Sequence, residues 1–556
     1  MELQYMKWRQ NQSVSEQYLN DFDSVRELFE YDYREKEAYI QRVEWIEGNA
    51  GKRAVPDSVI EVLLKYNDRV GNHPQAIEAL KQLIDPRALV VVGGQQAGLF
   101  TGPLLVIHKA ISILREARRA AEQLGRPVVP VFWIAGEDHD YDEVNHIYQL
   151  SGQLTVDKIE IPADEAQAGR RLTVSRRPIS AQQWETAIAQ LEATLMQTEF
   201  KAGWMQLLRD SCLDSISLSD SFARIMAHLF GEFGLVLLDS DDPALRAVEA
   251  PMFRELVKHN VQLEKALWSA KSKMQALGHE PSADVREGGA NLFWLQDGER
   301  LLLQRRDSDS VSDDSDEALF FDRSEVVRFS GLELAEQVDN SPDRFSNNVF
   351  TRPLMQDFLF PVLGTVLGPG EIAYWGLTKE AFHAFDMQMP IIVPRTEFTL
   401  VEGTIKKQLS KLELTFEETV FHLEEKKEKW LTAQDSLGIA EQFADVKRQF
   451  EELYAPVLQM VASINPGLKG LGETNHQKIV EQIEFLENRA KDAFESQFDA
   501  AKRQFERIKQ SLTPLGKRQE RVYNVFAYLN KYGADWLKVL IEAELEENGQ
   551  HVVVYM

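Results

Sequence analysis

The sequence predicts an α/β protein with a Rossmann-like nucleotide-binding core, two inserted connecting subdomains and a C-terminal antiparallel helical coiled coil. Three observations indicate this fold class. A β-α-β pattern begins at Leu89, long segments separate the later strands, and charged helical sequence with heptad spacing follows Val401. The chain has 556 residues, 44% of them apolar, which is enough for at least one large core and two or three domains.

The N-terminal segment, residues 1–85, is mixed in polarity and predicts helices packed on the core. The core itself is expected over residues 86–400, with insertions near 155–230 and 250–345 that are too long to be single crossovers. An acidic, Ser-rich stretch at 305–318 predicts a solvated loop. The expected core elements are strands at Leu89–Val92, Val128–Ile134, Leu235–Asp239 and Ile391–Val393, and a helix from about Pro103 to Leu124.

Residues 401–512 predict a hairpin of two helical arms. Apolar residues recur at alternating spacings of three and four on both sides of a Gly/Pro break at Asn465–Gly472. In the second arm the pattern shifts by one residue at Gln497. The apolar stripe of such an arm needs a partner, so we expect a homodimer formed through the coiled coil. Residues 513–556 are expected to return to the core.

Composition excludes several classes of protein. The net charge of −26 repels phosphate backbones, so nucleic acid is not an expected partner. No apolar run approaches the length of a membrane span, and the N-terminus lacks the apolar centre of a signal peptide, so we expect a cytoplasmic protein that does not insert into membranes. The single cysteine, Cys212, excludes a disulfide framework and a multi-thiolate zinc site, and we expect no bound metal.

The segment VVVGGQQAGLFTGP (Val90–Pro103) is typical of a strand, a tight loop and a helix start. Glycines allow a ligand to approach the backbone, and free amides at a helix N-terminus favour an anion. The loop matches neither common phosphate-binding motif, so an ordinary β-α turn is the alternative. The expected contacts of ATP or ADP are Gly93, Gly94 and Lys109; those of substrate are Gln95, Gln96, Thr101 and Gly102; His108 is a candidate catalytic residue.

A cluster of acidic and histidine side chains, EDHDYDEVNH (Glu137–His146), follows the second strand, which contains Trp133, a candidate substrate contact. Ligands bind at the carboxyl ends of strands in open α/β sheets, so Asp138, His139 and Asp140 are the candidate catalytic residues. If the stretch is helical, His139 shares a face with Glu143, and a metal site of mixed ligands is a second interpretation. A solvated first turn of a helix is the third.

Two further clusters carry candidate binding residues. Arg352 and Arg395 each lie beside a proline and suit a carboxylate or phosphate, while Glu371 and Tyr374 follow a tight Gly-Pro-Gly turn that could close a pocket. Surface ion pairs and core packing are the respective alternatives.

After the hairpin, Tyr523, Asn524 and Tyr528 predict a second nucleotide pocket, because aromatic rings stack on bases and an Asn amide can pair with adenine. Packing of the returning helix is the alternative.

Taken together, the motifs GGQQAGLFTGP, FWIAGEDHDYDEV, FSNNVFTRP, LGPGEIAYW, VPRTEF and QERVYN occur in an order that resembles the bacillithiol biosynthesis cysteine-adding enzymes, over almost the whole chain. The resemblance implies a core related to cysteinyl-tRNA synthetase-type ligases, two connecting insertions and a coiled coil for dimerisation. It also implies the last step of bacillithiol synthesis in low-GC Gram-positive bacteria, in which cysteine is joined to glucosaminyl malate.

The expected function is therefore a ligase that forms an amide bond between cysteine and glucosaminyl malate, with ATP-type activation of the cysteine carboxylate. The chain departs from the synthetase pattern because it has no H-x-G-H motif, no convincing K-M-S-K-S motif and too few cysteines for a thiolate zinc site. Two alternatives stay open: a coiled-coil scaffold with a degenerate nucleotide-binding core, and a metal-dependent hydrolase.

Overall fold

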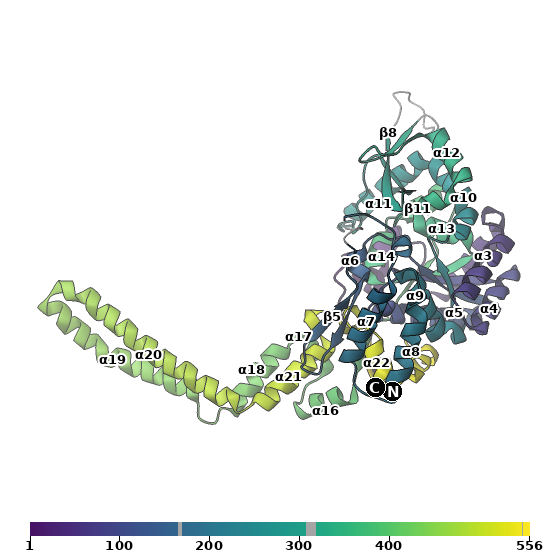
Figure 1. Cartoon of the computed structure of the whole chain (residues 1–556). Coiled ribbons are helices and arrows are strands. Elements are labelled where there is room, and N and C mark those ends of the chain that lie inside the picture. The colour runs from purple at the N-terminus through teal and green to yellow at the C-terminus, as the bar shows by residue number, and fades with distance from the viewer. Residues whose placement is uncertain (165–168, 307–317, 547–548) are drawn as a thin grey trace. The chain divides into compact units, whose positions relative to one another are not determined.

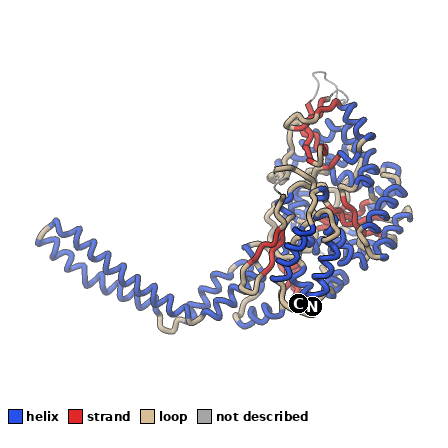
Figure 2. Tube along the Cα trace, in the orientation of Figure 1, coloured by secondary structure: helices blue, strands red, loops and turns tan. Residues whose placement is uncertain are grey.

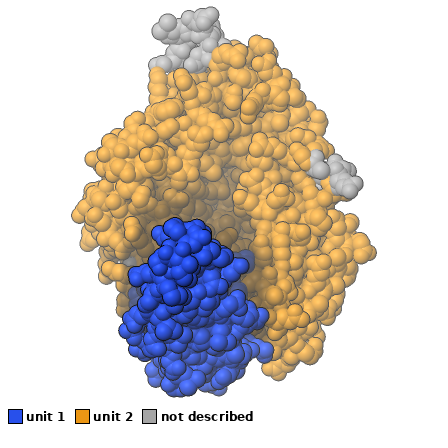
Figure 3. All heavy atoms as spheres, turned by 90° about the vertical axis from the view of Figure 1, so that its left-hand side faces the viewer, with its two compact units in different colours: residues 1, 400–516, 555–556 blue, residues 2–399, 517–554 orange. Residues whose placement is uncertain are grey.

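The computed structural model describes residues 1–164, 169–306, 318–546 and 549–556 (Figure 1). Residues 307–317 of the expected acidic loop lie outside this range. The chain divides into two compact units, coloured separately in Figure 3. The core unit comprises residues 2–399 and 517–554, and the helical unit comprises residues 1, 400–516 and 555–556.

A five-stranded parallel sheet forms the centre of the core unit. Its order is β13-β12-β2-β3-β6, which is the Rossmann order when the strands are numbered along the chain. The predicted Rossmann-like core is therefore confirmed. Strand β2 continues three residues beyond the predicted end, so Gly93 and Gly94 belong to the strand and not to a loop. The strands are β2 (Leu89–Gln95), β3 (Val128–Ile134), β6 (Val236–Asp239), β12 (Val362–Leu367) and β13 (Ile391–Pro394).

Helices pack on this sheet and on each other. Helix α5 (Leu104–Leu124) contacts β2, β3 and β12, and every residue from Val106 to Leu114 is buried. Four helices precede the sheet, and α2 and α3 contact its opposite edges at β13 and β6. They are α1 (Ser13–Asn20), α2 (Lys36–Gly48), α3 (Pro56–Arg69) and α4 (Pro74–Lys81).

The two chain ends form a small sheet that the sequence predicts only in part. Its order is β1-β15-β14, with β1 at Glu2–Met6, β15 at His551–Tyr555 and β14 at Phe398–Val401. Strand β15 makes the expected return of residues 513–556 to the core, whereas β1 was not predicted. The amide of Val552 donates to the carbonyl of Glu397 at 2.9 Å, which ties the last strand to the segment after β13.

The described residues of the first long connection, between β3 and β6, form a two-stranded antiparallel hairpin and four α-helices. Its first helix, α6, is only Tyr141–Val144, because His146 already begins strand β4. The shared helical face proposed for His139 and Glu143 is therefore wrong. The elements are β4 (His146–Leu150), β5 (Val156–Glu160), α7 (Ala181–Thr194), α8 (Lys201–Cys212) and α9 (Leu218–Phe230).

The second long connection, between β6 and β12, contains a five-stranded antiparallel sheet of order β10-β9-β8-β7-β11. Its strands are β7 (Gly289–Gln296), β8 (Glu299–Arg306), β9 (Leu319–Asp322), β10 (Arg328–Ser330) and β11 (Phe345–Asn347). The other helices of the core unit are α10 (Pro243–Lys258), α11 (Asn260–Ala276), α12 (Gly331–Asn340), α13 (Thr351–Leu359), α14 (Pro369–Trp375), α15 (Lys379–Ala384), α22 (Phe526–Tyr532) and α23 (Asp535–Glu542).

The helical unit contains the predicted coiled-coil hairpin. Helices α19 (Ile439–Ile464) and α20 (Lys469–Ser496) run side by side (Figures 1 and 2). The turn between them is shorter than the predicted break, because α20 begins at Lys469. The chain breaks again before α21 (Asp499–Leu512), where the apolar pattern shifts by one residue. The remaining helices are α16 (Gly403–Lys411), α17 (Phe416–Phe421) and α18 (Leu423–Gln434).

Within the described ranges, no helix has both the length and the apolar character that a bilayer crossing requires.

Candidate active site

A cleft of about 390 Å³ lies in the core unit, within the size range of small-molecule sites. One wall is the segment that follows β3, and the other is built from the antiparallel sheet and the start of α13. Four predicted site residues line it, namely Asp138, His139, Asp140 and Arg352. Lining residues that the sequence did not mark as site residues include Arg171, Arg286, Asn291, Phe293, Arg300 and Asn347.

Asp138 organises the turn at the end of β3. Its Oδ1 accepts hydrogen bonds from the backbone amides of His139 at 2.7 Å and of Asp140 at 3.3 Å, and its Oδ2 accepts one from Gln96 at 2.7 Å. Burial opposes ionisation of this carboxyl, but nearby Arg300 and the hydrogen bonds outweigh burial and lower its pKa. Asp138 is therefore an ionised carboxylate held in a fixed position.

His139 lies between two carboxylates and one guanidinium. Its Nδ1 is 3.8 Å from an oxygen of Asp138, and its Nε2 is 3.8 Å from an oxygen of Asp140. Nη1 of Arg300 donates to Nδ1 at 3.4 Å. Burial and Arg300 lower the pKa of His139, against the opposing effect of Asp140 and Asp138. The imidazole is thus neutral near pH 7, the state a general base requires.

Arg300 is the central residue of the opposite wall. It is buried, stacks over the ring of Phe293 at 3.8 Å, and donates to the hydroxyl of Ser346 at 3.0 Å and to the carbonyl of Asn347. No carboxylate among the described residues forms an ion pair with it. Glu137 and Asp138 act on its charge through space, but neither carboxylate accepts a hydrogen bond from it, which favours an anionic ligand.

Arg352 has a similar environment. Its Nη2 donates to the hydroxyl of Tyr374 at 2.7 Å, and within the described part of the chain no carboxylate pairs with it. Burial tends to lower its pKa, but Tyr374 and Glu371 reverse the effect, so the guanidinium stays charged. The sequence predicted both Arg352 and Tyr374 as binding residues, and the structure joins them.

A buried ionic network supports the cleft from behind. Glu137 accepts hydrogen bonds from Arg246 and, at 2.9 Å, from Ser346, and Arg246 also donates to Glu249 at 2.8 Å. Burial disfavours the ionised form of Glu137, but Arg246 and Arg300 lower its pKa. Glu137 therefore fixes the position of Ser346, and Ser346 in turn fixes Arg300.

A second group of predicted residues meets at the ends of β2 and β12. Lys109 is buried and donates to the carbonyl of Gly94 at 2.7 Å, to Gln95 at 3.1 Å and to Glu371 at 2.5 Å. Glu371 also accepts from the amide of Gly368 at 2.7 Å. Because Gln96 reaches Asp138, the loop after β2 connects this group to the cleft.

The structure corrects the role predicted for the loop before α5. A Cβ on Gly93 would lie 2.8 Å from Ile113, and one on Gly94 would lie 2.8 Å from the carbonyl oxygen of Trp133. These glycines therefore allow close packing of α5 and β3, rather than the approach of a phosphate. Trp133 is itself fully buried.

The start of α5 is covered by the chain itself. The amide of Leu104 donates to the carbonyl of Tyr523 at 2.8 Å, and the side-chain amide of Asn524 donates to the carbonyls of Phe100 at 2.7 Å and Gly102 at 2.6 Å. These contacts hold a tight turn in which Thr101 has a φ of +74°. One amide at the start of α5 that was expected to face a phosphate is therefore already bound within the chain, and ATP binding stays a prediction.

Asn524 is fully buried, and Tyr523 and Tyr528 are 3% exposed. The structure thus gives the amide of Asn524 a role in holding the turn, in agreement with the packing alternative. A second nucleotide pocket at these three residues stays a prediction.

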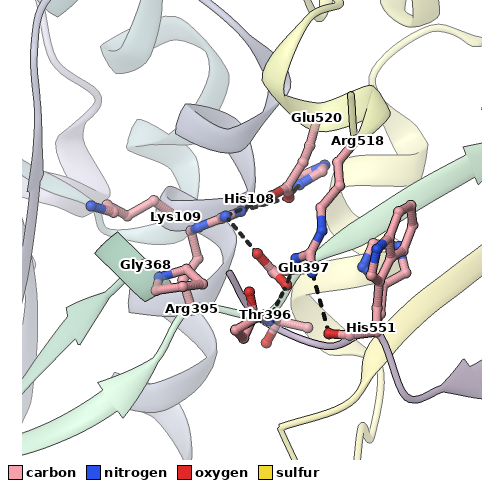
Figure 4. Close-up of polar contacts among 12 residues, drawn as sticks. His108, Lys109, Gly368, Arg395, Thr396, Glu397, Arg518, Glu520 and His551 are labelled. Atoms are coloured by element: carbon pink, nitrogen blue, oxygen red, sulfur yellow. Dashed lines mark hydrogen bonds and ion pairs between the residues drawn. The ribbon is translucent and has the colours of Figure 1, made fainter. Parts of the chain in front are cut away.

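His108 and Arg395 lie together, outside the cleft lining (Figure 4). Arg395 donates two hydrogen bonds of 2.7 Å to Glu520, and Nδ1 of His108 lies 2.8 Å from the same carboxylate. Arg518 pairs with the neighbouring Glu397. Burial and Arg395 lower the pKa of His108, although Glu520 opposes them. The geometry therefore indicates a structural ion network, in place of the catalytic and carboxylate-binding roles expected for these two residues.

In the described ranges, no group of three or more His, Cys, Asp or Glu side chains is arranged to hold a metal ion.

Sequence reasoning found the acidic wall of the cleft because its residues are contiguous and follow a strand. It missed Arg171, Arg286 and Arg300, which are separated along the chain and lie near or within an inserted sheet. For the polar residues beside Arg352 the sequence did hold a signal, because the motif FSNNVFTRP places Ser346, Asn347 and Asn348 just before it.

Comparison with known proteins identifies the family. Residues 1–396 match the model described as "Bacillithiol biosynthesis BshC, N-terminal Rossmann-like domain", and residues 398–556 match that of the C-terminal coiled-coil domain. The chain is 35% identical to proteins named "Putative cysteine ligase BshC" from Bacillus cytotoxicus and Bacillus anthracis, over 98% of both chains. It is also 35% identical to the Geobacillus sp. (strain WCH70) protein of that name, over 100% of both chains. The chain therefore belongs to the BshC family of bacillithiol biosynthesis.

Proposed function

We propose that this protein is a cytoplasmic cysteine ligase that joins the carboxylate of cysteine to the amine of glucosaminyl malate, as the last step of bacillithiol synthesis. Family membership supports a ligase of this pathway. The observation that carries the finer assignment is the division of the cleft into two walls. Asp138, His139 and Asp140 face a wall where Arg300 and Arg352 have no carboxylate partner among the described residues.

The malate part of the substrate fits the arginine wall. Malate brings two carboxylates, and guanidinium groups bind carboxylates with paired hydrogen bonds. Among the described residues the guanidinium of Arg352 donates to Tyr374, which leaves its other N–H groups for a ligand. Arg171 lines the same cleft and is exposed. These arginines replace the expected pair of Arg352 and Arg395, because Arg395 is bound to Glu520.

The sugar amine fits the acidic wall. An ammonium group between Asp138 and Asp140 would be held by charge, and it must lose a proton before it can attack a carbonyl carbon. His139 is the neutral base within reach of both carboxylates. Arg300 donates to its Nδ1, so the neutral ring carries its proton on Nε2. Binding of a malate carboxylate to Arg300 would free Nδ1 to take the proton.

The carboxylate of cysteine must be activated, because an amine does not displace oxide from a free carboxylate. ATP is the expected activator and stays a prediction, since the amide of Leu104 at the expected phosphate site is bound to the carbonyl of Tyr523. The thiol must be selected without a thiolate zinc site, because Cys212 is the only cysteine of the chain and is buried.

One experiment tests the proposed reaction. Purified protein is incubated with cysteine, glucosaminyl malate and ATP, and both bacillithiol and the cleaved nucleotide are measured by mass spectrometry. Formation of bacillithiol only in the complete mixture supports the ligase. Binding of none of the three molecules would favour a scaffold, and activity that depends on stoichiometric bound metal would favour a hydrolase.

The homodimer belongs to the same proposal. Helix α19 exposes an apolar stripe while its contacts with α20 are partly polar and aromatic, as in the stack of Phe450 on His476 and the pairing of Lys447 with Glu487 at 2.9 Å. A stripe of this length favours a second copy of the hairpin. The stripe residues are Val446, Leu453, Val457, Met460 and Ile464, which are 41–74% exposed.

A further inference from the structure

Asn347, at the end of β11, carries a polar group that the proposed mechanism does not use. The residue lines the cleft and is 1% exposed, yet neither its Oδ1 nor its Nδ2 has a hydrogen bond partner among the described residues. Buried amides are almost always paired, since an unpaired one loses its hydration without compensation. An unpaired amide beside a cleft therefore indicates a ligand.

The neighbours of Asn347 hold it firmly in place. Ser346 donates to Glu137 at 2.9 Å, and Asn348 accepts hydrogen bonds from the amides of Phe350 at 2.9 Å and Thr351 at 3.0 Å. The carbonyl of Asn347 itself accepts from Arg300. Strand β11 is paired with β7, where Asn347 lies opposite Leu292. The backbone is thus fixed on both sides, and only the side-chain amide is left without a partner.

A primary amide offers two donors and one acceptor, so its best ligand presents an acceptor and a donor close together. Vicinal hydroxyls of a sugar and the edge of adenine both satisfy this pattern. Adenine also needs a flat face to stack on. Two aromatic rings line the cleft, and neither presents a free face, because Phe293 is covered by Arg300 at 3.8 Å and Phe350 is only 2% exposed. The observations therefore favour the sugar.

We propose that the side-chain amide of Asn347 binds the adjacent C3 and C4 hydroxyls of the hexosamine ring and so selects the sugar of the substrate. The inference rests on the proposed function and adds to it a residue that recognises the sugar rather than malate or the amine. In glucosamine the amine is on C2, next to the C3 hydroxyl. One cleft therefore accommodates the amine at Asp138 and His139 and the hydroxyl pair at Asn347.

The test compares two ligands on three proteins by isothermal titration calorimetry. The ligands are glucosaminyl malate and free malate; the proteins are wild type, Asn347→Leu and the control Asn340→Leu, which changes an exposed asparagine outside the cleft lining. Asn347→Leu should weaken the affinity for glucosaminyl malate by about 10- to 100-fold, because two hydrogen bonds are lost. The affinity for malate should stay within about twofold of wild type. Asn340→Leu should change neither.

A second measurement on the wild type needs no variant. Removal of the C3 or the C4 hydroxyl from glucosaminyl malate should weaken binding, and removal of the C6 hydroxyl should not. This series decides the matter if Asn347→Leu fails to fold. Unchanged affinity for both deoxy compounds overturns the inference, as does an equal loss of affinity for malate and for glucosaminyl malate in Asn347→Leu. If wild type binds no glucosaminyl malate, the proposed function fails, and the inference with it.

Discussion

Replacing Arg395 by methionine separates a structural role of this arginine from the substrate-binding role that its sequence position suggests. Methionine keeps an unbranched aliphatic stem and removes the guanidinium. In the structure that guanidinium makes two hydrogen bonds of 2.7 Å to Glu520, whose side chain is fully buried. After the substitution, His108 is the remaining partner of the buried Glu520 carboxylate.

The expected cost follows from this burial. Breaking a buried ion pair by removing one partner destabilises a protein by about 3–5 kcal/mol, because the remaining charge is uncompensated. Since 1.4 kcal/mol corresponds to a factor of ten, the unfolding constant should rise by about 10²- to 10⁴-fold. His108 can recover part of this loss. Its pKa is lowered by burial and by Arg395, so without Arg395 it is more easily protonated, and the deficit should be smaller at pH 6 than at pH 8.

Urea unfolding, followed by the fluorescence of the buried tryptophans Trp133 and Trp375, measures this cost. The double variant Arg395→Met with Glu520→Gln removes both charges and should recover at least about 2 kcal/mol of the loss. Calorimetry on the folded single variant should show affinity for glucosaminyl malate within about twofold of wild type, whereas Arg352→Met should lose it. A stability loss below about 1 kcal/mol together with lost substrate affinity would refute the structural role.

Three further predictions concern the catalytic wall, the buried histidine and the coiled coil. Asp138→Asn and His139→Ala should each lower turnover by about 10²- to 10⁴-fold with a nearly unchanged thermal midpoint. In Asp138→Asn the side chain keeps an oxygen that can accept hydrogen bonds from the two turn amides. Normal turnover with a lowered midpoint would make these residues structural. Burial lowers the pKa of His551 to about 3, so its contribution to stability is complete above pH 6.5, the pKa of an unfolded histidine, and is lost as the pH falls. By pH 5 the loss in the free energy of unfolding should reach about 2 kcal/mol. His551→Gln should remove that part of the pH dependence in urea unfolding measured from pH 8 to 5. Leu453→Glu places a charge in the exposed stripe of α19 and should convert the proposed dimer to a monomer, as measured by light scattering. Glu452→Gln, outside the stripe, is the matched control. A wild type that is monomeric at every concentration would contradict the dimer.

The sequence by itself determined four of the five strands of the parallel sheet and the two arms of the hairpin, whereas β12 was not predicted. Strands such as Val128–Ile134 are continuous apolar runs, because a parallel sheet is buried on both faces, and this signal is local. The shift in the apolar pattern at Gln497 is local in the same way, and the structure breaks the helix there. The acidic wall could be predicted because its residues are contiguous and follow a strand.

Only the tertiary structure decided which polar residues meet. His108 and Arg395 were expected in the ligand site, but Glu520, more than a hundred residues away from either, binds both. Asn524 and Tyr523 fill the helix start that was expected to hold phosphate. Arg300 and Asn347 enter the cleft from an inserted sheet whose sequence shows only the alternation of its strands. Burial and ion pairing depend on contacts between distant segments, so the pattern around a single residue does not reveal whether its charge is free for a ligand or already neutralised within the protein.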